Sequence, residues 1–201
     1  MDINDPKQLK PIIEAALFAA EKPLALEHLL ALFPEDTQPP RRLLRTILAE
    51  LQENYQQDRG IELVEVASGY RFQVKQNIAP WLKRLWSKRS PRHSRALLET
   101  VAIIAYRQPI TRSEIEEIRG ISVNSSIIKT LLDYRWIRIL AYRDSPGRPG
   151  LYGTTRLFLD YFNLKSLDEL PSLPELQAME NLHVPTEDDT ETSSEISDET
   201  F

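Results

Sequence analysis

Apolar residues recur at helical spacing in two stretches of the chain, and each stretch is followed by a proline. The first covers residues 6–20 and the second residues 97–105. Residues three and four positions apart lie on one face of a helix, so each stretch predicts an amphipathic helix. When Pro23 is laid on Pro109, the apolar positions on both sides of the two prolines coincide. This offset of 86 residues indicates a duplicated unit.

In the first half, the residues after Pro23 predict two more helices and a hairpin. A short helix over residues 26–32 and a longer helix after Pro39-Pro40 carry apolar residues on one face. From residue 61 to residue 75 the period changes, and apolar residues alternate with polar ones on both sides of Ser68-Gly69. Alternation with a period of two around a turn-forming pair is typical of a β-hairpin.

The second half begins its repeat of this order with clear helix signals. Thr111 and Glu114 have the spacing of a capping box, in which a hydroxyl and a carboxylate accept hydrogen bonds from the first free amides of a helix. The short helix that they start is expected to end at Gly120. Ser122 is then expected to open the next helix.

A hairpin and a closing helix complete the second half. Strands over residues 136–142 and 151–154 flank a turn rich in glycine and proline. A helix over residues 157–162 is expected to end at Asn163, because asparagine tolerates the left-handed conformation. Helix, short helix, helix and hairpin is the order of a winged helix-turn-helix domain, and each half of the chain predicts one.

We therefore expect a mainly α protein with small β-hairpins, built as two tandem winged helix-turn-helix domains and a disordered acidic C-terminal tail. The N-terminal domain covers residues 1–87, a basic linker residues 88–96, the C-terminal domain residues 97–174 and the tail residues 175–201. The tail holds nine acidic residues and neither Lys nor Arg. With so few apolar residues to bury, it cannot offset the entropy lost on ordering its backbone.

Charge is distributed unevenly along the rest of the chain. The net charge is −5, but without the nine acids of the tail 21 acidic residues face 25 basic ones. Six basic residues and no acidic residue lie between positions 81 and 96. Four of these are candidate contacts to phosphate groups: Lys83, Arg84, Lys88 and Arg89. The alternative is a helix whose basic face is solvated while Trp81 and Leu85 pack onto the first domain.

Several classes of protein are excluded by the composition. No run approaches the roughly 20 apolar residues of a spanning helix, and the acidic N-terminus differs from a signal peptide, so we expect a cytoplasmic protein without membrane contact. The chain has no cysteine and only three scattered histidines, which do not form a local metal site. Neither a GxSxG nor a Walker sequence occurs, so we expect no enzymatic activity and no cofactor.

A winged-helix DNA-binding transcriptional regulator is the alternative function. Its second helix, over residues 122–134, would enter the major groove and present polar side chains to base edges. The residues available for this are few: Asn124, Ser125, Ser126 and Lys129. These residue types favour a solvated or partner-facing surface. Contact with DNA is therefore expected to be indirect, or weak and non-specific.

Three blocks of the second half closely resemble the segregation and condensation protein B family, ScpB. The blocks are LETVAIIAYRQPITRSEIEEIRG at residues 98–120, RDSPGRP through YGTT at residues 143–155, and FLDYFNL through LDELP at residues 158–171. The resemblance is strong over residues 97–174, looser over residues 7–87 and absent from the tail. Blocks of this length in the right order are highly specific to the family.

This resemblance implies a homodimer, formed mainly by the N-terminal domains, that binds the kleisin subunit ScpA and through it the SMC protein. The implied function is chromosome condensation and partition by a non-enzymatic accessory subunit at the nucleoid. Because ATP hydrolysis in such complexes belongs to the SMC heads, the family implies no active site in this chain.

The second winged helix supplies the residues that we expect to contact the kleisin. They are Tyr134, Trp136, Tyr142, Arg148 and Tyr152. Aromatic residues and arginine dominate interface energies, and Arg148 lies between a glycine and a proline that fix its position. Parity along the strand places Trp136 and Tyr142 on one face. That face either meets the partner or packs on Ile127 and Leu131.

Overall fold

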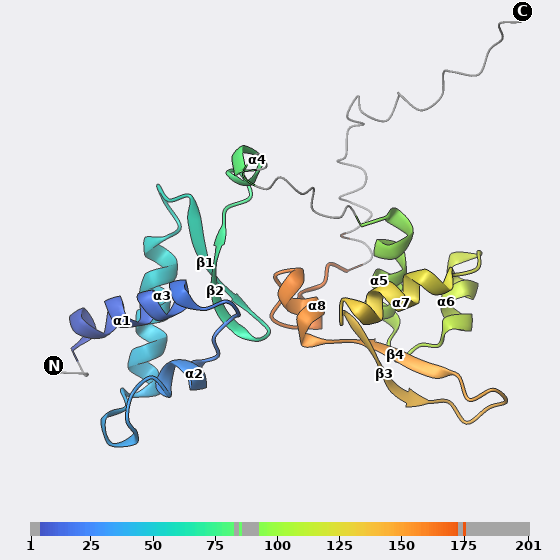
Figure 1. The fold of residues 1–201 in the computed structure, drawn as a ribbon, viewed down its shortest axis with the longest axis horizontal. Coiled ribbons are helices and arrows are strands. Elements are labelled where there is room, and N and C mark those ends of the chain that lie inside the picture. Colours follow the sequence, from blue (N-terminus) through green and yellow to red (C-terminus); the bar gives the residue numbers. More distant parts are fainter. Residues whose placement is uncertain (1–4, 83–84, 86–92, 173–174, 176–201) are drawn as a thin grey trace, which may run out of the picture. The chain divides into compact units, whose positions relative to one another are not determined.

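The computed structural model describes residues 5–82, 85, 93–172 and 175 of the 201-residue chain (Figure 1). It divides into two units, Met1–Asp168 and Glu169–Phe201. Among the described residues are eight α-helices and two separate two-stranded antiparallel sheets. The predicted acidic tail beyond Glu175, and residues 88–92 of the predicted linker, lie outside the described residues.

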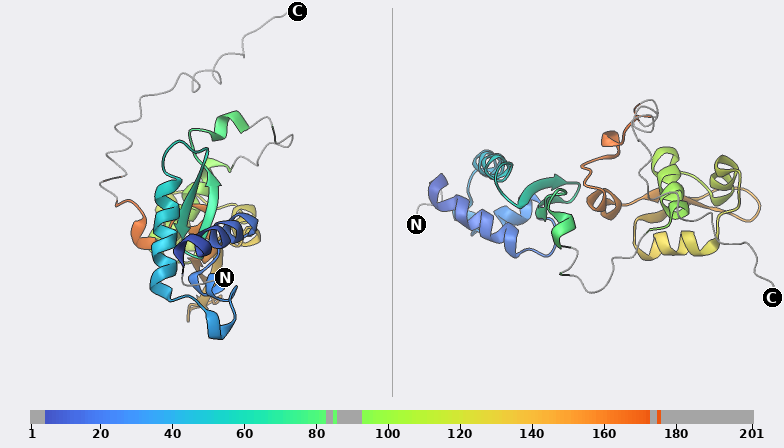
Figure 2. Two further views of the ribbon diagram at one scale, coloured as in Figure 1. Left: turned by 90° about the vertical axis from the view of Figure 1, so that its left-hand side faces the viewer. Right: turned by 90° about the horizontal axis from the view of Figure 1, so that it is seen from above.

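The first half folds in the order that its hydrophobic pattern predicts (Figures 1 and 2). Its elements are α1 (Pro6–Ala19), α2 (Leu26–Leu30), a 3-10 turn (Glu35–Thr37), α3 (Arg41–Asn54), β1 (Ile61–Val66), β2 (Gly69–Val74) and α4 (Ala79–Leu82). Helix α1 starts where the Asp5 carboxylate accepts a hydrogen bond from the N–H of Lys7, 3.0 Å away, and where Pro6 occupies the first turn. The predicted hairpin is confirmed, with Val66 opposite Gly69.

Leucine and isoleucine from α1 and α3 form the centre of the first core. The buried members are Leu9, Ile13, Leu17, Leu29, Leu30, Phe33, Leu44, Ile47, Leu48, Leu51 and Leu63. In α1 and α3 they recur at spacings of three and four residues, which places them on one face of each helix. Each such side chain contributes about 1.5–3 kcal/mol by leaving water, so this contact stabilises the first half.

The second half repeats the order and adds a closing helix. Its elements are α5 (Arg95–Arg107), α6 (Arg112–Arg119), α7 (Ser125–Asp133), β3 (Ile137–Tyr142), β4 (Gly150–Thr154), α8 (Arg156–Tyr161) and a 3-10 turn (Leu167–Glu169). All four helices and β3 contribute buried apolar side chains. The residue after α8, Phe162, precedes Asn163, whose φ of 58° confirms the predicted left-handed helix end.

The predicted start and end of α6 are confirmed, and the predicted start of α7 is wrong. The N–H of Thr111 donates to the Glu114 carboxylate at 2.8 Å, and the N–H of Glu114 donates to the Thr111 hydroxyl at 3.3 Å. Gly120 ends α6 with a φ of 69°. Helix α7 does not open at Ser122: its N-cap is Asn124, whose side-chain oxygen accepts a hydrogen bond from the Ser126 N–H at 2.9 Å. Asparagine and serine cap comparably well, so the sequence did not decide between them.

The duplication is visible in the backbone pairing of the two halves. Leu24, one residue after the first aligned proline, forms an isolated antiparallel bridge with Tyr70. Ile110, which is 86 residues further along the chain, forms the same kind of bridge with Tyr152. In each half, therefore, the residue that follows the first helix and its proline pairs with the second strand of the hairpin. The predicted internal repeat is confirmed by this topology.

Gly69 allows the first of these bridges to form. Its φ is 131°, a conformation that residues with a side chain rarely adopt. A Cβ atom added at this position would lie 2.2 Å from the carbonyl oxygen of Leu24. Leu24 therefore approaches the hairpin closely because the residue beside Tyr70 has no side chain.

Among the described residues, every helix is too short or too polar to cross a membrane.

Trp136 belongs to the core of the second half. Its side chain is 4% exposed, and its ring centroid lies 4.4 Å from that of Tyr161 and 5.2 Å from that of Phe162. It precedes β3 directly and donates its N–H to the carbonyl oxygen of Leu131 in α7 at 3.0 Å. Trp136 therefore joins α7, β3 and α8.

We expect Trp136→Ala to lower the free energy of unfolding by about 3–5 kcal/mol, because it replaces a buried indole by a cavity. Urea unfolding followed by circular dichroism measures this loss. Tyr142→Ala is the control, since Tyr142 is 59% exposed and should change stability by no more than about 0.5 kcal/mol. An unchanged urea midpoint for Trp136→Ala would show that Trp136 does not support the core.

The Glu114 carboxylate joins the capping box of α6 to the β3–β4 hairpin. It accepts hydrogen bonds from the N–H and the hydroxyl of Thr111, each at 2.8 Å, and pairs with Arg143 at 2.9 Å. These donors favour the ionised form and lower the pKa of Glu114 from 4.5 to about 2, with the Thr111 N–H as the largest cause. Stability from this group is thus present above pH 4.5 and is lost as the pH falls toward 2.

Glu114→Gln should destabilise the chain at pH 7, and the difference from the original chain should shrink steadily between pH 4.5 and pH 2. Denaturant unfolding at a series of pH values measures this difference. Glu117→Gln, an exposed position on the same helix, makes the same chemical change without these partners and serves as the control. A stability difference for Glu114→Gln that does not vary with pH contradicts the assignment.

Candidate functional site

The five residues predicted to contact a partner differ in exposure. Tyr134 directly follows α7 and is 38% exposed, Tyr142 ends β3 and is 59% exposed, and Arg148 is exposed in the turn between the strands. Tyr152 is half-buried in β4, where its N–H donates to the Ile110 carbonyl oxygen at 2.7 Å. Tyr134, Tyr142 and Arg148 are thus accessible to a partner, and Tyr152 only in part.

Trp136 is not available to a partner, because it is buried in the core. The prediction that Trp136 and Tyr142 share a face is wrong for a local reason. The register of β3 against β4 shifts between Ile139 and Ala141, so the strict alternation of faces is interrupted. Trp136, on one side of this irregularity, is buried, while Tyr142, on the other side, points into solvent.

Three half-exposed rings lie around Trp136 and form what we call the aromatic surface: Tyr134, Tyr161 and Phe162. Tyr134 and Tyr161 each contact Trp136, with centroid distances of 5.2 and 4.4 Å, and Phe162 packs on Tyr161 at 5.1 Å. The imidazole of His93 adjoins this surface and is 2.8 Å from the Tyr161 hydroxyl. Its rings therefore hold one another in fixed positions while part of each remains open to solvent.

Sequence reasoning missed Tyr161, Phe162 and His93. The pair Tyr161-Phe162 carries no decisive local signal, because adjacent residues of a helix can both be buried, as Ile47 and Leu48 are in α3. The two rings are 51% and 37% exposed. His93 carries no such signal, since its contact with Tyr161 joins residues 68 positions apart.

The β3–β4 hairpin presents further apolar side chains beside the predicted residues. Ile139 and Leu140 are 41% and 43% exposed. The Arg148 backbone has a φ of 41°, and its N–H donates to the Ser145 carbonyl oxygen at 2.8 Å, which fixes the turn. Large apolar groups on a fixed hairpin, next to an arginine, are typical of a protein-binding surface.

The polar groups at the start of α7 are occupied by internal contacts. The Asn124 side-chain oxygen caps the helix, and the Ser125 hydroxyl accepts a hydrogen bond from the Arg112 guanidinium at 3.0 Å. Arg112 also pairs with Glu116 at 3.0 Å, and Glu116 accepts the N–H of Val123. The Val123 N–H, followed by Arg112, lowers the pKa of Glu116. Two of the four groups considered for base reading are therefore already engaged.

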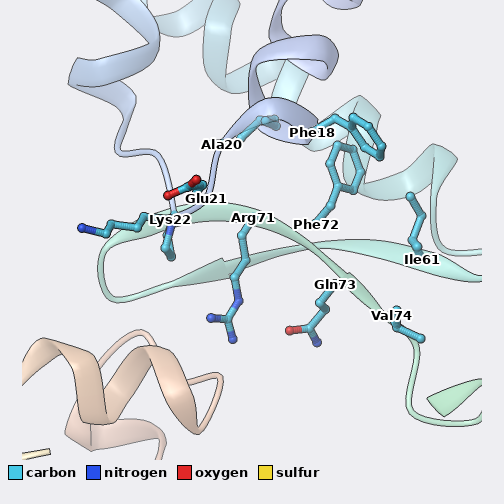
Figure 3. A pocket seen from close by; sticks show the side chains of 11 residues that line it. Phe18, Ala20, Glu21, Lys22, Ile61, Arg71, Phe72, Gln73 and Val74 are labelled. Carbon is cyan, nitrogen blue, oxygen red and sulfur yellow. The ribbon is translucent and has the colours of Figure 1, made fainter. Parts of the chain in front are cut away.

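A groove in the first half lies between the end of α1 and β2, with a cavity volume of about 290 Å³ (Figure 3). Its lining residues are Leu17, Phe18, Ala20, Glu21, Lys22, Pro23, Ile61, Arg71, Phe72, Gln73 and Val74. Figure 3 shows the rings of Phe18 and Phe72 side by side, while Arg71 and Gln73 point to the other side of the strand. We call this hollow the β2 groove.

The four predicted phosphate contacts lie outside the described residues: Lys83, Arg84, Lys88 and Arg89. Trp81 and Leu85 pack onto the first domain in the alternative given for this stretch, but they are 82% and 74% exposed, so that packing is wrong. Within the described part of the chain, no group of three or more His, Asp or Glu side chains is placed to hold a metal ion.

Comparison with known proteins agrees with the resemblance drawn from the sequence. The family model of the segregation and condensation complex subunit ScpB matches residues 11–173. A segregation and condensation protein B homolog of Coxiella burnetii is 56% identical over 173 residues, which cover 86% of this chain and 82% of the relative.

Two solved structures also align with the chain, both with low TM-scores. The crystal structure of ScpB from Mycobacterium tuberculosis has a TM-score of 0.37 and 30% identity, covering 80% of this chain and 98% of that one. A dimer of the ScpB N-terminal domain complexed with ScpA peptide has a TM-score of 0.36 and 32% identity, covering 42% of this chain and 95% of that one. From the family model and the identity to its relatives, the chain belongs to the ScpB family of segregation and condensation complex subunits.

Proposed function

We propose that this chain is a non-enzymatic accessory subunit of an SMC–kleisin complex and acts in chromosome condensation and partition. It binds the kleisin ScpA as a homodimer, and contacts SMC through the kleisin. Membership of a family of complex subunits supports a role in assembly. We place the chain in the cytoplasm, at the nucleoid, with two winged-helix domains that match the repeated order of its elements.

The observation that carries this proposal is the exposed aromatic and apolar surface of the second half. Tyr134, Tyr161 and Phe162 expose large rings that neighbouring rings hold in place, and the hairpin adds Tyr142 and Arg148. Rings fixed before binding lose little conformational entropy when a partner covers them. Tyrosine and arginine are also the residue types in which interface energy concentrates. This surface fits a protein partner better than it fits a phosphate backbone.

Contact with DNA is indirect in this proposal, or weak and non-specific. Asn124 and Ser125, at the start of α7, make hydrogen bonds within the protein, so reading a base edge would break existing contacts. We therefore do not favour a transcriptional regulator. A salt series separates the two functions, because affinity for DNA phosphates falls steeply with salt while an apolar protein contact does not.

The dimer contact lies in residues 1–80 in this proposal. Two large side chains of this region are strongly exposed: Phe18 at 73% and Leu32 at 50%. Exposed apolar groups of this size favour association, because burying them removes them from water.

Arg148→Ala and Tyr142→Ala should each weaken binding of purified ScpA by about 1–3 kcal/mol and leave the melting temperature nearly unchanged, because both side chains are exposed. Isothermal titration calorimetry measures the affinity. Arg42→Ala, an exposed arginine of α3, is the control for the loss of one positive charge. If Arg148→Ala binds as tightly as the original chain, the hairpin is not the kleisin contact.

In sedimentation equilibrium, a fragment that starts at Ser90 should behave as a monomer, while the full chain should behave as a dimer. The fragment keeps the buried residues of α5 to α8, and circular dichroism checks that it folds. Dimerisation of the fragment as tight as that of the full chain would place the dimer contact in the second half instead.

A further inference from the structure

The turn of the first hairpin contacts the end of α8 through hydrogen bonds from its backbone. Ala67 and Ser68 form this turn, between β1 and β2. The N–H of Ala67 donates to the Leu164 carbonyl oxygen, and the N–H of Ser68 donates to the Asp160 carboxylate, both at 2.9 Å. Each of these bonds therefore joins the first half of the chain to the second.

Arg71 of β2 adds a charged side chain to the same contact. It leaves the strand on the side opposite Phe18 and Phe72, as Figure 3 shows. Its Nη2 donates to the carbonyl oxygen of Asp160 at 2.7 Å and to the side-chain oxygen of Asn163 at 2.6 Å. The carbonyl groups of a helix give its C-terminal end a partial negative charge, so a cation is favourable there. Arg71 therefore strengthens the contact between the hairpin and α8.

Asp160 is a buried carboxylate at the centre of this contact, with 5% of its surface exposed. Burying a carboxylate costs free energy unless hydrogen-bond donors satisfy it. Among the described residues, the donor to this carboxylate is the Ser68 N–H, which belongs to the other half of the chain. The side chain of Asp160 is therefore satisfied by the hairpin and not by the core of its own half.

The contact between the halves is polar, which makes it reversible. Lys165 and Glu65 add an ion pair at 3.2 Å, and the buried Nε of Arg71 has no hydrogen-bond partner in the described part of the chain. A hollow of about 320 Å³ beside the contact is lined by residues of the first half and by Arg156. Polar contacts exchange for water at a small net free energy, so the two halves can separate and close again.

The same contact lies on both sides of two rings of the aromatic surface. Asp160 directly precedes the pair Tyr161-Phe162 and Asn163 directly follows it, and Arg71 binds both flanking residues. The backbone that carries the two rings is therefore held at both ends by the first half. A side chain that is fixed before binding loses less conformational entropy when a partner covers it.

We infer that this contact is a latch, which closes the first hairpin onto α8 and holds Tyr161 and Phe162 in position for a protein partner. The latch consists of Ala67, Ser68 and Arg71 on one side and of Asp160, Asn163 and Leu164 on the other. This inference rests on the proposed function, in which the aromatic surface contacts ScpA. Closing of the latch and binding of ScpA then favour each other, because a coupling between two sites acts in both directions.

A distance measurement tests the latch in the absence of ScpA. The chain has no cysteine, so Ala49→Cys in α3 and Lys129→Cys in α7 provide two exposed sites for spin labels. Excess unlabelled chain ensures that a dimer carries a single labelled copy. Double electron–electron resonance should then give one narrow distance distribution for the labelled chain. Adding Arg71→Ala or Asn163→Gly should broaden this distribution toward longer distances.

The variants are chosen to remove the latch and leave the elements intact. Asn163→Gly removes an acceptor of Arg71 and keeps the helix end, because glycine adopts the same left-handed conformation. Gln73→Ala is the control on the same face of β2, since Gln73 donates to Glu62 within the hairpin at 2.9 Å. Gln73 also lines the β2 groove, as Arg71 does, so this control covers effects of the groove. Thermal melting checks that each variant folds.

Isothermal titration calorimetry with purified ScpA tests the coupling. Arg71→Ala and Asn163→Gly should each raise the Kd by about fivefold or more, while Gln73→Ala should leave it unchanged. The double variant of Arg71 and Asn163 should raise the Kd no further than Arg71→Ala does, because both changes break one contact. Saturating ScpA should also narrow the distance distribution of spin-labelled Arg71→Ala, since binding favours the closed form.

The outcomes separate this inference from the proposed function. If Arg71→Ala and Asn163→Gly keep the narrow distance distribution, the contact does not hold the halves together, and the inference is wrong while kleisin binding stands. If both variants open the chain but bind ScpA with the original Kd, the latch does not position the rings, which again overturns the inference alone. An equal loss of affinity for Gln73→Ala would assign the effect to the β2 groove instead. If ScpA does not bind the original chain, the proposed function and this inference are both wrong.

Discussion

The two hydrogen bonds between Leu24 and Tyr70 connect the helices of the first half to its hairpin. They form because Gly69 leaves room for the Leu24 carbonyl oxygen. The bridge between Ile110 and Tyr152 does the same in the second half. Without such bridges, a two-stranded hairpin is at best marginally stable in water. They therefore allow each small sheet to pack against its helices.

The bridges also influence which surfaces remain open. Leu24 occupies the outer edge of β2 at one position only, so the edge beyond Tyr70 borders a groove. In the second half, the equivalent bridge holds Tyr152 in a half-buried position and leaves the other strand, β3, with exposed side chains from Arg138 to Tyr142. The same construction thus presents an apolar groove in one half and an apolar hairpin in the other.

Aromatic packing in the second half combines stability and recognition. Trp136 is buried, and the rings that cover it, Tyr134, Tyr161 and Phe162, remain partly exposed. Contact with the buried indole restricts the motion of the outer rings, because a close-packed interior permits few alternative rotamers. A rigid aromatic surface is therefore a consequence of how this core is closed.

The sequence by itself determined the order and type of nearly all elements, the repeat, the capping box at Thr111 and Glu114, and the family. These features depend on residues close together in the chain, where periodicity and cap chemistry act directly. Tertiary structure alone decided that Trp136 is core while Tyr142 is exposed. Trp136 packs on Tyr161 and Phe162, whereas every residue of β3 after Ile137 is exposed. Tertiary structure also decided that Tyr161 meets His93 and that Phe18 borders β2, since such contacts join residues far apart in the chain.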